Sequence, residues 1–220
     1  MRISILRIAA VVVTTLLLNA CASTDYSAFK ESRPRSILVM PPINQSPDVN
    51  APLTFLATSV YPLAESGYYV IPVSLSDQTF KQNGITIAEE AHSINHLRLR
   101  EIFGADAALY ITITRYGTKF LITSSSTEAE AEVKLVDLRN GVELWQSKVR
   151  AEANSGGAVS GGGLIGALVT ISANAAAQAI NVAKDKAYDV GRDANHRMLA
   201  AKGGKGTILY GPYSPEFQSD

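Results

Sequence analysis

Short runs of hydrophobic residues alternate along the chain with longer segments in which hydrophobic positions recur every three or four residues. This pattern predicts strands that alternate with helices. Residues 37–40 are four consecutive hydrophobic residues followed by two prolines, which indicates a strand buried on both faces. Residues 51–66 have the spacing of an amphipathic helix that ends at Gly67, and residues 68–73 return as a strand. We therefore expect a β-α-β unit with parallel strands.

A polar segment at residues 74–84 leads to a helix predicted over residues 86–103. Three strands follow, at residues 107–116, 127–138 and 142–151. The last two strands are separated by Arg139-Asn140-Gly141, and Asn-Gly between alternating segments is a strong hairpin signal. Small and branched hydrophobic residues alternate with glutamate and lysine in the first of these strands. The hairpin is therefore expected to have one buried and one solvent-exposed face.

A glycine-rich stretch at residues 155–166 leads into a helix of small residues that we expect over residues 164–201. Charged side chains occur only in the second half of this helix. The whole pattern predicts an α/β fold: a single mixed sheet of about five strands with packed helices, plus a long C-terminal helix of small residues. The α/β domain is placed at residues 36–201, including the glycine-rich loop, and a C-terminal tail at residues 202–220.

The N-terminus has the features of a bacterial lipoprotein signal peptide. Arg2 and Arg7 precede an uncharged and mostly hydrophobic run at residues 9–18, which is shorter than the roughly 20 residues that a membrane span needs. Leu18-Asn19-Ala20-Cys21 then matches a lipobox that ends in the single cysteine of the chain. We therefore expect residues 1–20 to be removed and Cys21 to carry a diacylglycerol thioether and an N-acyl chain such as palmitate.

Several acyl chains make such an anchor effectively permanent, so the mature protein is expected to stay at a membrane. Ala22 follows Cys21, whereas retention at the inner membrane usually requires Asp at that position. We expect an outer-membrane lipoprotein whose domain faces the periplasm. The polar residues 21–35 are interpreted as a lipid-anchored tether between the membrane and the domain.

The charge balance excludes nucleic acid as an expected partner. Removal of residues 1–20 takes Arg2 and Arg7 from the 20 basic residues and leaves all 20 acidic residues, so the mature net charge is about −2. The only cysteine is used for lipidation, so no disulfide is expected.

Two motifs in the chain are formally similar to known functional sites. Residues 161–166 match the form G-x-G-x-x-G, but the expected helix continues where a Rossmann unit requires a strand with an acidic residue. His92 and His96 lie four residues apart on one face of the predicted helix, but Ser93 occupies the position of the glutamate in H-E-x-x-H. They are weak metal-ligand candidates, and a solvent-exposed face is the favoured interpretation. We therefore predict a protein without catalytic residues or cofactor.

Small residues recur at a spacing that permits close approach between helices, at Gly162, Gly166, Ala173 and Ala177. One interpretation is a contact face for a homodimer or a partner, or for membrane insertion. The other is a flexible loop that leads into a helix packed on its own sheet. The sequence leaves both open.

Three segments resemble a family of Gram-negative lipoproteins of unassigned function: Met40-Pro41-Pro42-Ile43-Asn44, residues 61–70 and Tyr210-Gly211-Pro212-Tyr213. The resemblance extends over nearly all of the mature chain and carries no catalytic residues. It implies a fold akin to the amino-terminal domain of TolB. It also implies genes adjacent to lipoproteins that resemble CsgG, the curli secretion channel, a role in envelope assembly or transport, and a dimer.

The resulting functional hypothesis is a non-enzymatic accessory that binds other envelope lipoproteins, CsgG-like ones among them, through its sheet edge, its long helix or its tail. The alternative hypothesis is a periplasmic lipoprotein that binds a small molecule or a metal ion at His92 and His96 or at the glycine-rich loop.

Overall fold

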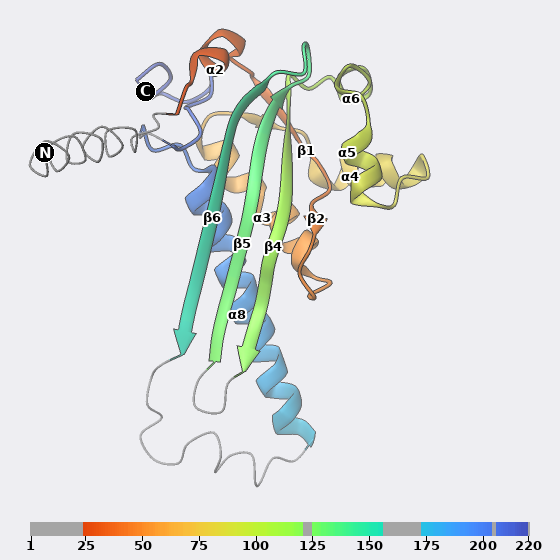
Figure 1. The fold of residues 1–220 in the computed structure, drawn as a ribbon, viewed down its shortest axis with the longest axis vertical. Coiled ribbons are helices and arrows are strands. Elements are labelled where there is room, and N and C mark those ends of the chain that lie inside the picture. The colour runs from red at the N-terminus through yellow and green to blue at the C-terminus, as the bar shows by residue number, and fades with distance from the viewer. Residues whose placement is uncertain (1–23, 121–124, 156–172, 204–205, 220) are drawn as a thin grey trace, which may run out of the picture.

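The computed structural model describes residues 24–120, 125–155, 173–203 and 206–219 and contains one six-stranded sheet with helices on both faces (Figure 1). The strands are β1 (Ser36–Val39), β2 (Ile43–Asn44), β3 (Tyr69–Val70), β4 (Ala107–Phe120), β5 (Ser125–Asp137) and β6 (Glu143–Ser155). The helices are α2 (Ser27–Ser32), α3 (Ala51–Glu65), α4 (Val73–Gln82), α5 (Ala88–Ser93), α6 (His96–Phe103) and α8 (Ala173–Leu199).

The predicted mixed sheet is confirmed. Its strand order is β3-β1-β4-β5-β6, and the short strand β2 also pairs with β4. Strand β1 is parallel to both β3 and β4, which confirms the β-α-β unit, whereas β4, β5 and β6 form an antiparallel meander. The predicted hairpin therefore lies at one side of the sheet. The extra strand is β2, which two residues form after the proline pair.

The main hydrophobic core lies between one face of the sheet and the helices α3 and α8. Ile37 and Val39 of β1, Leu109 and Ile111 of β4, and Phe55 of α3 are at most 1% exposed in this core. Helix α8 packs against α3 and across β4, β5 and β6 (Figure 1). The predicted long C-terminal helix of small residues is thus a principal support of the sheet.

A second, smaller core covers the opposite face of β1 and β4. Leu38 and Met40 alternate with the residues of the first core along β1, so their side chains point to the other face. There they meet Phe80 of α4 and Leu99 of α6. The helices α4, α5 and α6 therefore cover only the β1 side of this face, and the β5–β6 side carries charged residues.

The region between β3 and β4 differs from the prediction. The sequence pattern predicts a polar connection at residues 74–84, but α4 occupies most of them and buries Ser76 and Phe80, which lie one helical turn apart. The helix predicted over 86–103 is interrupted at Ile94 and Asn95, whose backbones are extended. The side chain of Asn95 then caps α6 by accepting the N–H of Leu97 at 2.9 Å.

Both ends of the described chain pack onto the domain. Helix α2 lies within the expected tether, and its Phe29 is 3% exposed in the main core. In the C-terminal tail, Ile208 is fully buried and Leu209 nearly so. Residues 27–35 therefore belong to the folded domain: Phe29 is buried in the main core, and the Ser32 carbonyl and the Arg35 N–H are hydrogen-bonded to the side chains of Arg139 and Asp106, respectively. No helix in the described parts of the chain combines the length and hydrophobicity needed to cross a membrane.

Candidate functional site

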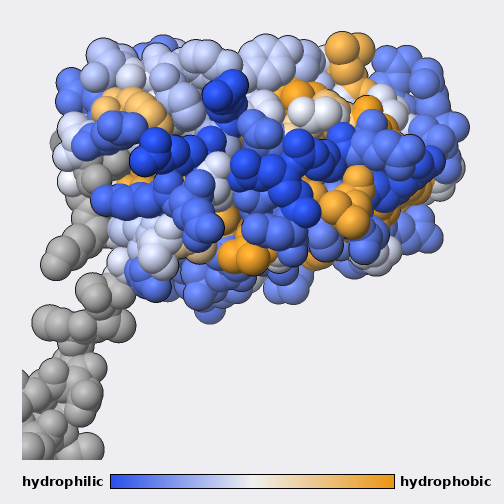
Figure 2. Space-filling view, turned by 90° about the horizontal axis from the view of Figure 1, so that it is seen from above, coloured by the Kyte–Doolittle hydropathy of each residue, from blue (hydrophilic) through white to orange (hydrophobic). Residues whose placement is uncertain are grey.

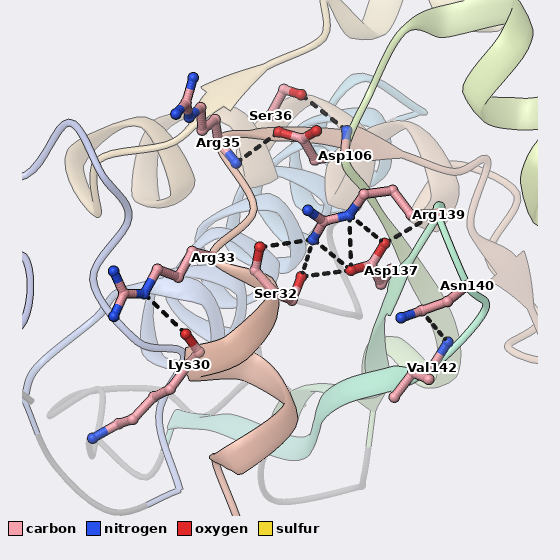
Figure 3. A network of polar contacts seen from close by, with 10 residues as sticks. All are labelled: Lys30, Ser32, Arg33, Arg35, Ser36, Asp106, Asp137, Arg139, Asn140 and Val142. Carbon is pink, nitrogen blue, oxygen red and sulfur yellow. Dashed lines mark hydrogen bonds and ion pairs between the residues drawn. The ribbon is translucent and has the colours of Figure 1, made fainter.

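An ion pair between the buried Asp137 and the partly exposed Arg139 fixes α2 to the turn between β5 and β6 (Figure 3). Asp137, at the end of β5, is only 1% exposed. Its carboxylate accepts hydrogen bonds from Ser32 Oγ at 2.6 Å and from Nε and Nη2 of Arg139 at 2.6 to 3.1 Å. Nη2 of Arg139 also donates to the Ser32 carbonyl oxygen at 2.7 Å. The ion pair therefore holds both the side chain and the backbone at the end of α2.

Asp137 and Arg139 stabilise each other in their charged forms. Burial alone would raise the pKa of Asp137, but the hydrogen bonds from Arg139 and Ser32 together hold it below its ordinary value. The same hydrogen bond to Asp137 raises the pKa of Arg139. Because both groups stay charged at neutral pH, they hold the structure together and are not poised to transfer protons.

A second contact ties down the segment that follows α2. The N–H of Arg35 donates to Oδ2 of Asp106 at 2.9 Å, and Ser36 Oγ accepts the N–H of Asp106 at 3.0 Å. Figure 2 shows this end of the molecule as a mainly hydrophilic surface with separate small hydrophobic patches. The chain therefore enters the domain through a rigid, polar end of the sheet.

Two of the segments that carry the family resemblance meet in space. The N–H of Gly211 donates to the Ser66 carbonyl at 2.7 Å, and the N–H of Tyr213 donates to the Gly67 carbonyl at 3.0 Å. The hydroxyl of Tyr68 donates to the Leu209 carbonyl at 2.6 Å. The Tyr-Gly-Pro-Tyr segment is thus a clasp on the turn between α3 and β3.

A pocket of about 220 Å³ opens between α2 and this clasp. Phe29, Tyr68 and Leu209 form its buried floor, and Phe217 forms part of its wall. The exposed cationic residues Lys30 and Arg33 lie on its rim. The pocket therefore combines a hydrophobic interior with positive charge at its mouth.

The open face of β4, β5 and β6 carries a network of ion pairs. The side chain of Glu128 is 8% exposed and contacts Arg115, Lys119 and Arg150. Glu130 contacts Lys148 at 3.0 Å, and the hydrogen bond from Lys148 lowers the pKa of Glu130. The predicted polar face of the hairpin is confirmed and is exposed at Glu132, Lys148 and Arg150, whereas Glu128 and Glu130 are largely covered by the basic side chains that they contact.

Strand β6 forms one edge of the sheet. Its 13 residues pair with β5 from Glu143 to Ser155, and the strand order places no further strand beside it among the described residues. Helix α2 contacts β6, whereas Figure 1 shows no described element beside the outer edge of its lower half. Among the described residues, the outward-facing backbone N–H and C=O groups of this edge therefore have no partner strand.

The candidate metal ligands His92 and His96 lie in two different helices, so the predicted shared helix face is wrong. His92 lies in α5, where its Nε2 is 2.8 Å from the Pro41 carbonyl oxygen and its ring meets Tyr110 edge-on. Burial lowers the pKa of His92, and the contact with Pro41 offsets this only in part. His96 begins α6 and packs against Gly141. The described residues contain no cluster of three or more His, Cys, Asp or Glu suited to a metal ion.

The structure describes only some of the other predicted site residues. Cys21, Gly162 and Gly166 lie outside the described residues. Ala173 and Ala177 lie in the first turns of α8. The small-residue face therefore stays a prediction.

The profile of the family described as "Putative lipoprotein GNA1162-like" matches residues 24–213. The chain belongs to this family. Over 208 residues it is 45% identical to the lipoprotein NMB1124/NMB1162 of Neisseria meningitidis serogroup B strain MC58, which covers 92% of this chain and 94% of that protein. The match confirms the resemblance at the level of a lipoprotein family.

One solved structure of the same family agrees with the fold, and a more distant one is only weakly similar. The crystal structure of lipoprotein GNA1162 from Neisseria meningitidis is 46% identical and superposes with a TM-score of 0.54, covering 67% of this chain and 99% of that one. The LpoB C-terminal domain from Salmonella enterica is 15% identical, with a TM-score of 0.37 over 62% of this chain and 90% of that one.

Sequence reasoning missed the ion pair at α2 and the pocket beside it. One local signal was present: Asp137 precedes the hairpin turn, and its Oδ1 accepts the N–H of Arg139 at 2.7 Å, as an aspartate before a turn commonly does. The partner Ser32 is distant in sequence, so no spacing pattern could identify it. The pocket likewise joins residues from both ends of the chain.

Proposed function

We propose that this protein is an outer-membrane lipoprotein, anchored through Cys21 and facing the periplasm, that acts without catalysis as an accessory in envelope assembly or transport. The lipobox at residues 18–21 and membership of a lipoprotein family support the anchor. The open edge of β6 carries the rest of the proposal. It pairs with an extended segment of another envelope protein, for which CsgG-like lipoproteins are the first candidates.

The chemistry of the edge selects this class of partner. Unpaired backbone groups on an edge strand are best satisfied by a strand from another chain, and proteins use such strand addition for recognition. The charged side chains of β6 do not block the edge, because Lys148 and Arg150 turn toward β5, where they contact Glu130 and Glu128 at 3.0 and 3.5 Å. Gln146 to Glu152 is thus the segment to which a partner strand would bind.

The polar groups of the described region favour a binding role over an enzymatic one. Asp137 is held in an ion pair, and the imidazole of His92 is engaged by the Pro41 carbonyl. Small-molecule binding is the second candidate function, and the observation that favours it is the pocket beside α2.

Strand pairing is tested with a photo-crosslinking amino acid at Gln146 in cells, with the exposed Gln82 of α4 as the matched control position. The crosslinked partner is identified and purified, and hydrogen exchange is measured on the full lipoprotein with and without it. We expect slower exchange of backbone amides in residues 146–152. Slower exchange on α3 and α8, with β6 unchanged, would rule out edge pairing.

A further inference from the structure

We propose that the α2 end of the domain rests on the membrane and binds phosphate groups of phospholipid headgroups through Arg33 and Arg35. The opposite end, where β4 ends and β5 begins, then points into the periplasm. This inference rests on the proposed anchor at Cys21. It adds the orientation of the domain and the side chains that contact lipid, and it is independent of strand pairing at β6.

The chain between the anchor and the domain is short. Thr24, the first residue that the structure describes, follows Cys21 almost directly. Tyr26 is already fixed to the domain, because its hydroxyl donates to the Thr207 carbonyl at 2.6 Å and accepts the N–H of Gly206 at 2.9 Å. The extended chain from Cys21 to Tyr26 spans at most about 18 Å. An acylated Cys21 therefore holds the start of α2 within about this distance of the lipid.

The sheet is much longer than this connection. Helix α2 lies at the end of the sheet where β1, β3 and β4 begin (Figure 1). Strand β4 has 14 residues, and at about 3.3 Å per residue its other end, at Phe120, lies roughly 45 Å away. The α2 end is therefore always close to the lipid, whereas the far end reaches the lipid only if the domain lies on its side.

Two arginines at the α2 end are available to lipid phosphate. Arg33 and Arg35 are exposed on either side of the buried Pro34, and neither forms an ion pair with a described residue. Their backbones are fixed: Arg33 caps the end of α2 with φ 44°, and the N–H of Arg35 donates to Oδ2 of Asp106 at 2.9 Å. Arginine binds phosphate through two parallel N–H donors. The two guanidinium groups are therefore cations on a rigid base that face solvent without a carboxylate partner.

The charges around these arginines suit a phospholipid headgroup. Arg33 and Arg35 line a polar hollow of about 540 Å³, which Glu31 and Asp106 also line. In Figure 3 both guanidinium groups point away from the ion pair that occupies Arg139. Groups of both signs match a zwitterionic headgroup, in which a phosphate and an ammonium group are neighbours. The arginines contact the phosphate in this arrangement, and Glu31 contacts the ammonium group.

Exposed tyrosines lie beside the arginines. Tyr69 is 56% exposed and Tyr213 is 67% exposed. The N–H of Tyr69 donates to the Arg35 carbonyl at 2.9 Å, and the N–H of Tyr213 donates to the Gly67 carbonyl, so both belong to the α2 end. Tyrosine is enriched where lipid meets water, because its ring is hydrophobic and its hydroxyl is polar. The mixed hydrophilic and hydrophobic surface of this end in Figure 2 agrees with a position among headgroups.

The test uses the mature lipoprotein in phosphatidylethanolamine nanodiscs that contain a lipid with a nitroxide on its headgroup. Cys21 is the only cysteine and is acylated, so Ser219→Cys or Val49→Cys supplies a single thiol for a fluorescent label. Ser219 is exposed and follows tail residues that line the polar hollow, whereas Val49 is 82% exposed beside the second half of β4. We expect the nitroxide to quench the label at position 219 at least about twofold more strongly than the label at position 49.

Removal of both arginine charges should weaken the contact. Arg33→Asn combined with Arg35→Gln is expected to lower quenching at position 219 at least about twofold, because the phosphate loses its charged donors. Asparagine tolerates the left-handed conformation of Arg33, so the fold is kept, which a thermal melt verifies. Lys81→Gln combined with Arg192→Gln is the matched control, since it removes two exposed positive charges from α4 and α8. We expect it to leave quenching unchanged.

The outcomes separate this inference from the proposed anchor. Equal quenching at the two positions, or stronger quenching at position 49, would overturn the orientation. Quenching at position 219 that the arginine variant does not change would overturn phosphate binding. In each of these cases the protein still elutes with the nanodiscs, so the anchor stands. A mature protein that does not elute with nanodiscs would refute the acylated anchor, and this inference with it.

Discussion

Gly67 and Gly211 pack backbone against backbone: a Cβ atom built on Gly211 would lie 2.3 Å from the carbonyl oxygen of Gly67. The turn after α3 and the C-terminal clasp can approach this closely only because both residues lack a side chain. Gly67 also has φ 88°, a conformation that glycine adopts most easily. The clasp closes the pocket wall, so this contact links the stability of the tail to the candidate binding site.

Gly211→Ala is expected to lower the free energy of unfolding by about 1 to 3 kcal/mol, because the added methyl group must displace backbone atoms. Urea denaturation measures the change. Gly84→Ala is the control: its φ is 80°, but nothing lies within 4 Å of an added Cβ, so it carries strain without a clash. No loss of stability in Gly211→Ala would show that the close approach does not matter.

Asp137 should make stability depend on pH. Its pKa is lowered in the folded protein, so its contribution is complete above the unfolded value, near 3.8, and is lost as the pH falls through the lower folded value. Asp137→Asn is therefore expected to cost about 2 kcal/mol at pH 7, in the range for a partly buried pair, and progressively less below pH 4. Unfolding at a series of pH values checks this. A cost that stays constant down to pH 2 would contradict the ion-pair interpretation.

Phe29→Ala is expected to lower the free energy of unfolding by about 3 kcal/mol, because Phe29 is 3% exposed in the main core. The variant distinguishes two roles of residues 21–35: a packed part of the domain, as in the structure, or a tether that adds nothing to the core, as the sequence pattern predicts. A chain that begins at Ser32 should likewise melt below one that begins at Thr24. If the two chains had the same melting curve, α2 would be only a tether.

The regular elements could be predicted because their signals are local. Asn140-Gly141 fixed the hairpin, and four consecutive hydrophobic residues identified β1. Helix α4 escaped prediction because only Phe80 and the small Ser76 anchor it, which gives too weak a periodicity. The break at Asn95 depends on the cap that its side chain forms. A continuous helix would have the same hydrophobic spacing, so the sequence pattern does not distinguish the two.

The candidate site was less predictable, because its contacts join distant parts of the chain. Ser32 meets Asp137, and Phe29 shares a pocket with Leu209. No spacing, charge or hydrophobic pattern along the sequence links the two residues of either pair. The clasp and the turn that it contacts both belong to segments that carry the family resemblance, but only the structure shows that Gly67 and Gly211 are in contact.

Cys21→Ala should leave the protein as an unacylated precursor, since acylation requires the thiol and cleavage follows acylation. Metabolic labelling with a fatty-acid analogue checks the result. Undiminished incorporation of label in the variant would remove the basis for the anchor.

The small-residue face at the start of α8 leads to the last prediction. Helix α8 packs against α3 and three strands, but the charged residues of the helix lie toward its C-terminal half. If two copies, or this chain and a partner, meet near Ala173 and Ala177, a bulky side chain separates the helices. Ala173→Leu is then expected to weaken self-association in sedimentation experiments and to leave the thermal melt nearly unchanged.

The same substitution has the opposite signature if Ala173 packs inside its own domain. Overpacking a core costs about 1 to 3 kcal/mol, so the melting temperature would fall while association stayed the same. Ala64→Leu, at an exposed position of α3, controls for the added hydrophobic surface. Because the two interpretations move different observables, one pair of measurements on one variant decides between a contact face and a supporting helix.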